Sequence, residues 1–242
     1  GIKHKKAIVD ARRGKLFTKL GRAITVAAKD GGGDPDGNPS LALAIQKAKD
    51  ASMPKDNIER AIAKGTGSGA DANALENVLY EGYGPGGVAL LIEAVTDNRN
   101  RTGADVRHLL TKHGGSLGEP GSVAYNFDKT GLIIVDGSKH DEDDLLVAIE
   151  AGATDVIEDE SVFEVLAEPS DLTAVRAALE AAGIEFESSE VTQRPKLRVP
   201  LDEEGAAKLL RLIDALEDND DVDAVHANFD VDEEVLERLL SA

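Results

Sequence analysis

Residues 1–64 place apolar side chains at the spacing of an amphipathic helix, with basic residues mainly on the other side. The run Gly31–Gly33 ends the first helix, because glycine is entropically costly to hold in a helix. Asn38-Pro39 is typical of the start of a second helix, and Ser52 of a third that ends before Gly65. The pattern predicts a bundle of three short helices.

From residue 79 onward the pattern alternates between short strands and helices, and the first two strands flank a Gly-Pro-Gly-Gly turn. The predicted strands are, in chain order, 79–82, 88–95, 122–127, 132–135, 155–158, 163–166, 185–191, 197–200 and 222–229. The predicted helices between them are 102–113, 142–151, 170–182 and 203–216. This mixture of elements predicts an α+β protein.

The middle of this series has the order strand, helix, strand, strand, helix, strand, which is typical of a ferredoxin-like domain. The segments before and after this middle series each contain a strand, a helix and a strand, which is half of the same unit. As separate domains, the two halves would each expose a sheet edge and an apolar face. We therefore expect an α+β multidomain protein with an N-terminal three-helix bundle and two ferredoxin-like α+β domains, one inserted in the other. The predicted domains are a basic helical domain at 1–74, a discontinuous α+β domain at 75–128 and 193–242, and an inserted ferredoxin-like domain at 129–192.

Composition narrows the class of protein. The chain has no Cys, which excludes disulfides, thiolate metal sites and a cysteine nucleophile. Its longest apolar run, Val88–Ile92, is too short to span a bilayer, and no charged-then-apolar signal sequence opens the chain. With Phe 5, Tyr 3 and Trp 0, aromatic platforms for single-stranded bases are not expected. We expect a soluble, monomeric, cytoplasmic protein with no membrane partner.

Charge is divided unevenly along the chain. Residues 1–64 contain 14 Lys and Arg against 7 Asp and Glu, a net of +7. The rest contains 13 basic against 39 acidic residues, a net of −26, and the whole chain has a formal net charge of −19. A basic region on an acidic body can bind a polyanion at one place and repel it elsewhere. This prediction requires that acidic groups of the later residues leave the basic side chains unneutralised.

Two basic stretches are candidates for contact with nucleic-acid phosphates. The first covers the opening segment and the first helix, with two cations of the third helix; its alternative is a solvated helix face. The second joins a strand to a helix that Asn100 or Thr102 is expected to cap, where exposed amides and the helix dipole favour an anion. Its alternative is a capped loop whose arginines pair with neighbouring acids. The candidate residues are Lys3, His4, Lys5, Lys6, Arg12, Arg13, Lys15, Lys19, Arg22, Lys29, Lys55, Arg60, Arg99 and Arg101.

Motifs associated with catalysis or ligand binding fail on their context. The loop Gly82–Gly87 satisfies GxGxxG, but a strand follows it where a dinucleotide site needs a helix N-terminus. The acidic loop that starts at Asp34 lacks the Gly and Glu that an EF-hand requires, and the five His show no paired ligand spacing. We expect no catalytic residue, no metal site and no cofactor. An enzyme or ligand-binding module that uses the Gly82–Gly87 loop is a remaining alternative.

Five motifs, in order along the chain, closely resemble those of the YebC family. They are IKHKK at 2–6, GGGDP at 31–35, MPKDNIERAI at 53–62, YEGYGPGGV at 80–88 and TDNRNRT at 96–102. The resemblance implies a helical bundle followed by two α+β domains of ferredoxin-like kind. It also implies one of two functions. Members are described as DNA-binding transcriptional regulators, and as ribosome-associated translation factors that relieve stalling, notably at proline-rich stretches.

The favoured hypothesis is a non-enzymatic, ribosome-associated translation factor whose basic N-terminal domain binds ribosomal RNA. Rescue of a stalled peptidyl transfer would then be positional, by ordering the substrates. The alternative, a DNA-binding transcriptional regulator, requires an element that reads bases in the major groove. The second and third helices offer a thin set of side chains for that purpose: Gln46, Lys47, Lys49 and Asn57. The predicted partner is the ribosome, with DNA as the alternative partner.

Overall fold

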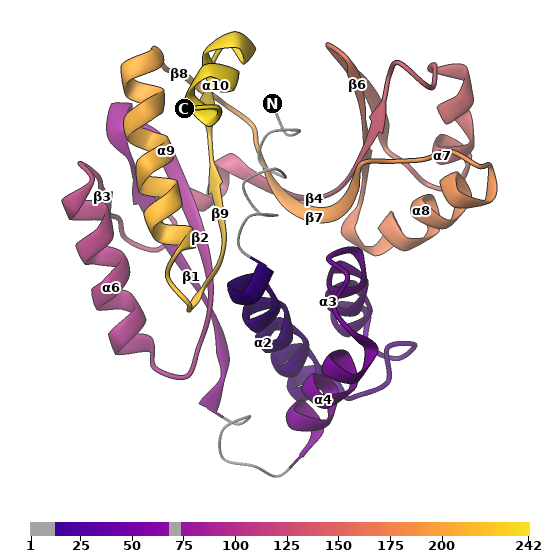
Figure 1. The fold of residues 1–242 in the computed structure, drawn as a ribbon, viewed down its shortest axis with the longest axis horizontal. Coiled ribbons are helices and arrows are strands. Elements are labelled where there is room, and N and C mark those ends of the chain that lie inside the picture. Colours follow the sequence, from indigo (N-terminus) through magenta and orange to yellow (C-terminus); the bar gives the residue numbers. More distant parts are fainter. Residues whose placement is uncertain (1–12, 68–73) are drawn as a thin grey trace. The chain divides into compact units, whose positions relative to one another are not determined.

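The computed structural model describes residues 13–67 and 74–242, whose fold is drawn in Figure 1. The chain divides into two compact units, residues 1–126 with 195–242 and residues 127–194. The predicted inserted segment, 129–192, lies within the second unit. Each unit contains a four-stranded sheet together with helices, which confirms the predicted α+β class.

Three helices form the N-terminal bundle: α2 (Arg13–Gly31), α3 (Pro39–Asp50) and α4 (Lys55–Thr66) (Figure 1). Asn38 begins α3 as predicted, because its side-chain oxygen accepts the Leu41 amide at 3.2 Å. Buried apolar side chains of all three helices form the core of the bundle: Leu20, Ile24, Leu41, Ala48, Ile58 and Ala61. The predicted bundle is confirmed.

The end of α4 differs from the prediction. The helix continues through Gly65 to Thr66. Gly65 is buried against α2, where an added Cβ would lie 2.3 Å from the carbonyl oxygen of Thr25. At the same crossing the Thr25 hydroxyl donates to the Ala61 carbonyl at 3.0 Å. Glycine at this position therefore lets two helices approach closely and does not end one.

The sheet of the first unit joins distant parts of the sequence. β1 (Glu76–Tyr83) and β2 (Ala89–Thr96) pair antiparallel across the predicted turn, in which Pro85–Gly87 form a short 3-10 helix. β3 (Ser116–Leu117) and β9 (Val222–Ala227) add to the two edges, so that the strand order is β3-β1-β2-β9. The two chain segments that make up this unit, before and after the inserted one, therefore contribute strands to a single sheet.

Two helices, α6 (Arg99–Lys112) and α9 (Glu203–Glu217), pack on one face of that sheet (Figure 1). In the sequence, α6 precedes the inserted unit and α9 follows it. Their apolar sides form a single core with the strands, which includes Leu90, Ile92, Val106, Leu110, Leu209, Leu212 and Val225. Removal of this apolar surface from water is what holds the two segments together.

The predicted strand at 197–200 is wrong in its extent. Only β8 (Val199–Pro200) forms, and it pairs in parallel with β10 (Phe229–Asp230) outside the main sheet. Pro195 and Pro200 have no amide hydrogen to donate, which disfavours a central strand here. In a ferredoxin-like sheet the 197–200 strand would lie next to β2. That place is occupied by β1, which is joined to β2 by a short turn and so pairs with it at little cost in chain entropy.

The predicted strand at 122–127 is also wrong. Ala124–Asn126 form a short 3-10 turn, and the next strand, β4 (Phe127–Asp136), belongs to the sheet of the inserted unit. Backbone amides of this segment must still be hydrogen-bonded where they are buried. A side chain of β1 supplies the acceptor that a neighbouring strand would have supplied.

That acceptor is the buried carboxylate of Glu81. It accepts the amides of Gly121, Val123 and Ala124 at 2.6, 3.0 and 2.7 Å. Burial raises the pKa of Glu81, but these three hydrogen bonds outweigh burial, and the pKa lies below its ordinary value. The ionised carboxylate is therefore a structural part of the loop.

The inserted unit has the ferredoxin-like order that the sequence predicts. Its strands lie in the order β5-β6-β4-β7, and α7 and α8 connect them (Figure 1). The predicted helix at 142–151 is shorter, because Asp143–Leu145 form a 3-10 turn before α7. The remaining elements are α7 (Leu146–Glu150), β5 (Asp155–Asp159), β6 (Val162–Ala167), α8 (Leu172–Ala181) and β7 (Ser188–Pro195).

The helix α10 (Glu233–Leu240), which follows β10, is not among the predicted elements. The signals available in the sequence are its acidic first turn and its apolar residues at helical spacing, Val235, Leu236, Leu239 and Leu240. Among the described residues, no helix combines the length and apolar content that crossing a bilayer needs.

We expect the substitution Glu81→Gln to lower the free energy of unfolding by about 1–3 kcal/mol, because at least one buried amide loses its acceptor. The pKa of Glu81 is lowered by folding, so its contribution is present above the unfolded pKa and is lost as pH falls through the folded pKa. The stability difference between the two proteins is therefore largest near neutral pH and shrinks below about pH 4. Urea unfolding at a series of pH values measures both effects.

The control is Glu119→Gln, which alters an exposed carboxylate just before the same loop. We expect it to change the stability by less than about 0.5 kcal/mol. Equal losses in the two variants would contradict the structural role of Glu81.

Candidate nucleic-acid interface

The predicted interface begins in a part of the chain that the structure does not describe. Five of the candidate residues lie outside the described range: Lys3, His4, Lys5, Lys6 and Arg12. Arg13 and Lys15 belong to the first turn of α2. For these seven residues, phosphate contact stays a prediction.

The next three candidates on α2 bind groups of the same unit. The Lys19 ammonium donates to the Glu217 carbonyl at the end of α9, and the Lys29 ammonium donates to the Leu75 carbonyl at 2.8 Å. The Arg22 guanidinium pairs with Asp221 at 2.9 Å. The requirement that later residues leave these cations unneutralised is therefore not met by Arg22. On its described length, α2 is a helix that docks onto the α+β part of the unit.

Asp221, just before β9, is the centre of this docking. Its carboxylate is 6% exposed and lies 2.9 Å from the Arg22 guanidinium and 3.0 Å from that of Arg101. The Thr102 hydroxyl lies 2.8 Å from the same carboxylate. Three elements, α2, α6 and the segment before β9, are joined at one buried charge.

Burial raises the pKa of Asp221, but the hydrogen bonds from Thr102, Arg101 and Arg22 outweigh burial, and the pKa lies below its ordinary value. The hydrogen bonds that the Arg101 guanidinium donates to Asp221 and to Asp97 raise the pKa of Arg101. A buried carboxylate costs little only when it is both paired and hydrogen-bonded. This site satisfies both conditions.

The second basic stretch, at the start of α6, has a different cap from the predicted one. Asn98 caps the helix, since its side-chain oxygen accepts the Arg101 amide at 3.0 Å, and Asn100 and Thr102 do not. Thr102 is fully buried, and its hydroxyl lies 2.7 Å from that of Thr96. The residue that sequence analysis treats as a surface cap is part of the internal network around Asp221.

The arginines of this stretch pair with acids, which is the alternative stated for them. Arg101 lies 2.9 Å from Asp97 as well as bonding Asp221, and Arg99 lies 3.5 Å from Glu76. Arg99 is 63% exposed, so its pairing is weak and leaves the guanidinium accessible. Of the two, only Arg99 is placed where a phosphate could displace its partner.

The bundle presents further cations on its outer surface. Lys55 is 86% exposed and lies 3.6 Å from Glu59, and Arg60 hydrogen-bonds to Asn57 at 3.0 Å. From the sequence, Lys47 and Lys49 are considered only as base-reading side chains and Lys64 is not considered, although all three are exposed. No carboxylate among the described residues pairs with these three ammonium groups. The signal that could have found them is their placement on the polar sides of α3 and α4.

The amide side chains of α3 and α4 are engaged within their own helices. Gln46 donates to Asp50 at 3.0 Å, and Asn57 accepts from Arg60. Amides that read adenine need both donor and acceptor directed outward. The described surface of these helices is therefore suited to phosphate contact more than to base contact. Within the described residues, no three His, Asp or Glu side chains gather as a metal ion would require.

Comparison with known proteins places both parts of the chain in one group. Residues 1–68 match the family model described as the TACO1/YebC protein N-terminal domain. Residues 75–229 match the model described as the TACO1/YebC second and third domain.

Similar sequences occur in several bacteria. A relative from Acidothermus cellulolyticus, named "Probable transcriptional regulatory protein", is 58% identical over 235 residues, which cover 97% of this chain and 95% of the relative. A relative of the same name from Rubrobacter xylanophilus is 56% identical over 236 residues, covering 97% and 94%. The crystal structure of a conserved hypothetical protein from Aquifex aeolicus has a TM-score of 0.82 at 50% identity and covers 98% of each chain. The whole fold is therefore shared with a solved structure.

We expect Asp221→Asn to lower the free energy of unfolding by about 2–3 kcal/mol, because two guanidinium groups lose an ionic partner at a buried position. The control is Asp220→Asn, in which the neighbouring exposed carboxylate is neutralised. It should change the stability by less than about 0.5 kcal/mol. Chemical denaturation of both variants provides the comparison.

A double-mutant cycle separates the docking of α2 from the rest of the network. Arg22→Gln alone is expected to destabilise the protein, whereas the same change in the Asp221→Asn background adds less than about 0.5 kcal/mol. Full additivity would contradict a direct interaction between Arg22 and Asp221.

Proposed function

The chain belongs to the TACO1/YebC family, and from this we propose that it is a non-enzymatic regulatory protein that binds nucleic acid and acts on transcription. The names of its relatives, "Probable transcriptional regulatory protein", support transcription as the process. The structural observation that supports nucleic-acid binding is the set of exposed cations on α3 and α4, which are Lys47, Lys49, Lys55, Arg60 and Lys64.

The charge of the rest of the chain gives these cations their importance. A formal net charge of −19 repels nucleic acid from most of the protein. Contact is therefore confined to surfaces where cations outnumber acids. Lysines on exposed helix positions neutralise phosphates and release counterions, which is a sequence-independent and salt-sensitive source of affinity. The undescribed segment 1–12 adds further basic residues to the same end of the chain.

A second candidate function is a ribosome-associated translation factor that relieves stalling, with ribosomal RNA as the polyanion. The observation that favours it is the engagement of Gln46 and Asn57 within their own helices. This leaves lysine and arginine as the main outward-facing hydrogen-bond donors of the two helices. Phosphate contact without base reading is sufficient on ribosomal RNA, where position is set by the ribosome, but is insufficient for a sequence-specific operator.

We expect the triple variant Lys47→Gln, Lys49→Gln, Lys64→Gln to bind DNA and RNA more weakly than the wild type. If all three contact phosphates, the slope of log K against log salt becomes less steep by about 2 to 3. Fluorescence anisotropy with labelled duplex DNA and single-stranded RNA, over a salt series, measures this slope.

The control is the double variant Lys129→Gln, Lys139→Gln, which alters two exposed lysines of the inserted unit. For each variant, the change in affinity and in salt slope is divided by the number of charges removed. An equal change per charge in both variants would mean that only net charge matters. That result would contradict a binding surface on α3 and α4.

Two further measurements separate the candidate functions. A regulator of transcription protects defined DNA sites in a footprint, with affinity about a thousandfold or more above that for random DNA at the same salt. A translation factor sediments with ribosomes and reduces the toeprint of a stall on a Pro-Pro-Pro message. Whichever of the two results is absent rules out the corresponding candidate.

A further inference from the structure

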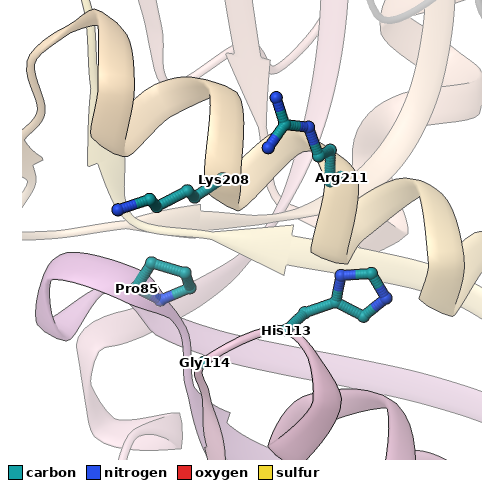
Figure 2. A pocket seen from close by; sticks show the side chains of 5 residues that line it. All are labelled: Pro85, His113, Gly114, Lys208 and Arg211. Carbon is teal, nitrogen blue, oxygen red and sulfur yellow. The ribbon is translucent and has the colours of Figure 1, made fainter.

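The first unit contains a hollow that neither the bundle nor the family comparison accounts for. It has a volume of about 460 Å³ and is lined by Pro85, His113, Gly114, Lys208 and Arg211. Figure 2 shows Lys208 and Arg211 on α9, with Pro85 and the His113-Gly114 turn facing that helix. The hollow therefore lies where the β1–β2 turn and the end of α6 meet α9.

Its charge is opposite to that of the chain as a whole. Three of the five lining residues, His113, Lys208 and Arg211, have nitrogen atoms that donate hydrogen bonds. Lys208 lies 2.8 Å from Glu204, but the two side chains are 54% and 77% exposed, and such a pair is worth little. No carboxylate among the described residues pairs with the Arg211 guanidinium. On a chain with a net charge of −19, this is a local excess of positive charge.

The wall opposite α9 consists of two glycine turns held against each other. A Cβ at Gly115 would lie 2.3 Å from the Tyr83 carbonyl oxygen, so the turn after α6 packs directly on the backbone of the hairpin. Gly86, Gly87 and Gly114 have φ of 77°, 77° and 80°, a region that only glycine adopts without strain. These turns bring no acidic side chain and little bulk to the hollow. They also hold its shape, because the hairpin backbone and the α6 turn are in direct contact.

A phosphate group is the ligand that this chemistry fits. A guanidinium binds phosphate oxygens in pairs, an ammonium supplies a point charge, and an imidazole N–H can donate one further hydrogen bond. The volume exceeds that of a lone phosphate and falls within the range of small-molecule pockets. The ring of Pro85 adds an apolar surface beside the charges.

We propose that the hollow between the Gly82–Gly87 turn, the His113-Gly114 turn and α9 binds the phosphate group of a nucleotide, with Lys208 and Arg211 as its cationic ligands. The nucleotide is either free or part of a nucleic-acid strand. The site does not depend on the proposed function, since it involves none of the cations of α3 and α4.

The test is a titration followed by ¹H–¹⁵N NMR of the full chain, with the Gly114 amide and the His113 ring as reporters. The probes are inorganic phosphate, adenosine monophosphate and a short single-stranded oligouridylate, each against sodium chloride at the same ionic strength. We expect the three phosphate probes to shift both reporters and sodium chloride to shift neither. Absence of a shift with all three probes would overturn the proposal.

The double variant Lys208→Gln, Arg211→Gln should weaken binding of each phosphate probe by about tenfold or more. Lys139→Gln is the matched control, an exposed lysine in a similar carboxylate pair on the inserted unit. Undiminished affinity in the double variant would overturn the assignment of the ligands. Unchanged amide signals from the sheet confirm that the double variant is folded.

The same titration identifies the source of the phosphate. Tighter binding of the oligouridylate than of adenosine monophosphate indicates a nucleic-acid strand, and the reverse order indicates a free nucleotide. Repeating the titration with the triple lysine variant of α3 and α4 keeps the two hypotheses apart. Reporter shifts that persist there support the hollow even when the proposed function fails.

Discussion

The carboxylate of Asp221 is the point on which the first unit depends. It receives Arg22 from the helical bundle, and Arg101 and Thr102 from the start of α6, at a position that is 6% exposed. An unpaired charge at such a depth would cost several kcal/mol, so the three donors and the carboxylate require one another. Because the donors come from two helices, Arg22 from α2 and the other two from the first turn of α6, satisfying this one group also positions α2 and α6 against β9.

That constraint changes the meaning of the uneven charge distribution. Part of the basic opening is bound within the chain itself, since Arg22 pairs with the Asp221 carboxylate and the ammonium groups of Lys19 and Lys29 donate to backbone carbonyls beyond residue 74. An intramolecular partner is present at a high effective concentration and needs no second molecule. Among the described residues, the surfaces that remain for a polyanion include the outer surface of α3 and α4, the exposed Arg99 and, on the sheet domain, the hollow beside α9.

Buried polar groups also explain where the sequence-based elements are wrong. The strand predicted at 122–127 does not form, and Glu81 supplies the acceptors that a strand partner would have supplied. A helix end was expected at Gly65, yet that glycine serves the close crossing of α2 and α4. In both cases the deciding partner lies 36 or more residues away and leaves no periodic signal in the local sequence.

Local pattern was enough for the three helices of the bundle, the Asn38 cap, the hairpin turn and the strand–helix order of the inserted unit, because each depends on residues within a few positions of one another. The family followed from motifs that are likewise contiguous. Counting charges identified which residues are basic but gave no information on which of them are already paired. Pairing depends on distance in space, and Arg22 and Asp221 are 199 positions apart in sequence. The burial of Thr102 and the hollow that Pro85 and Arg211 both line were decided only by the tertiary structure, since each results from packing between segments far apart in the sequence.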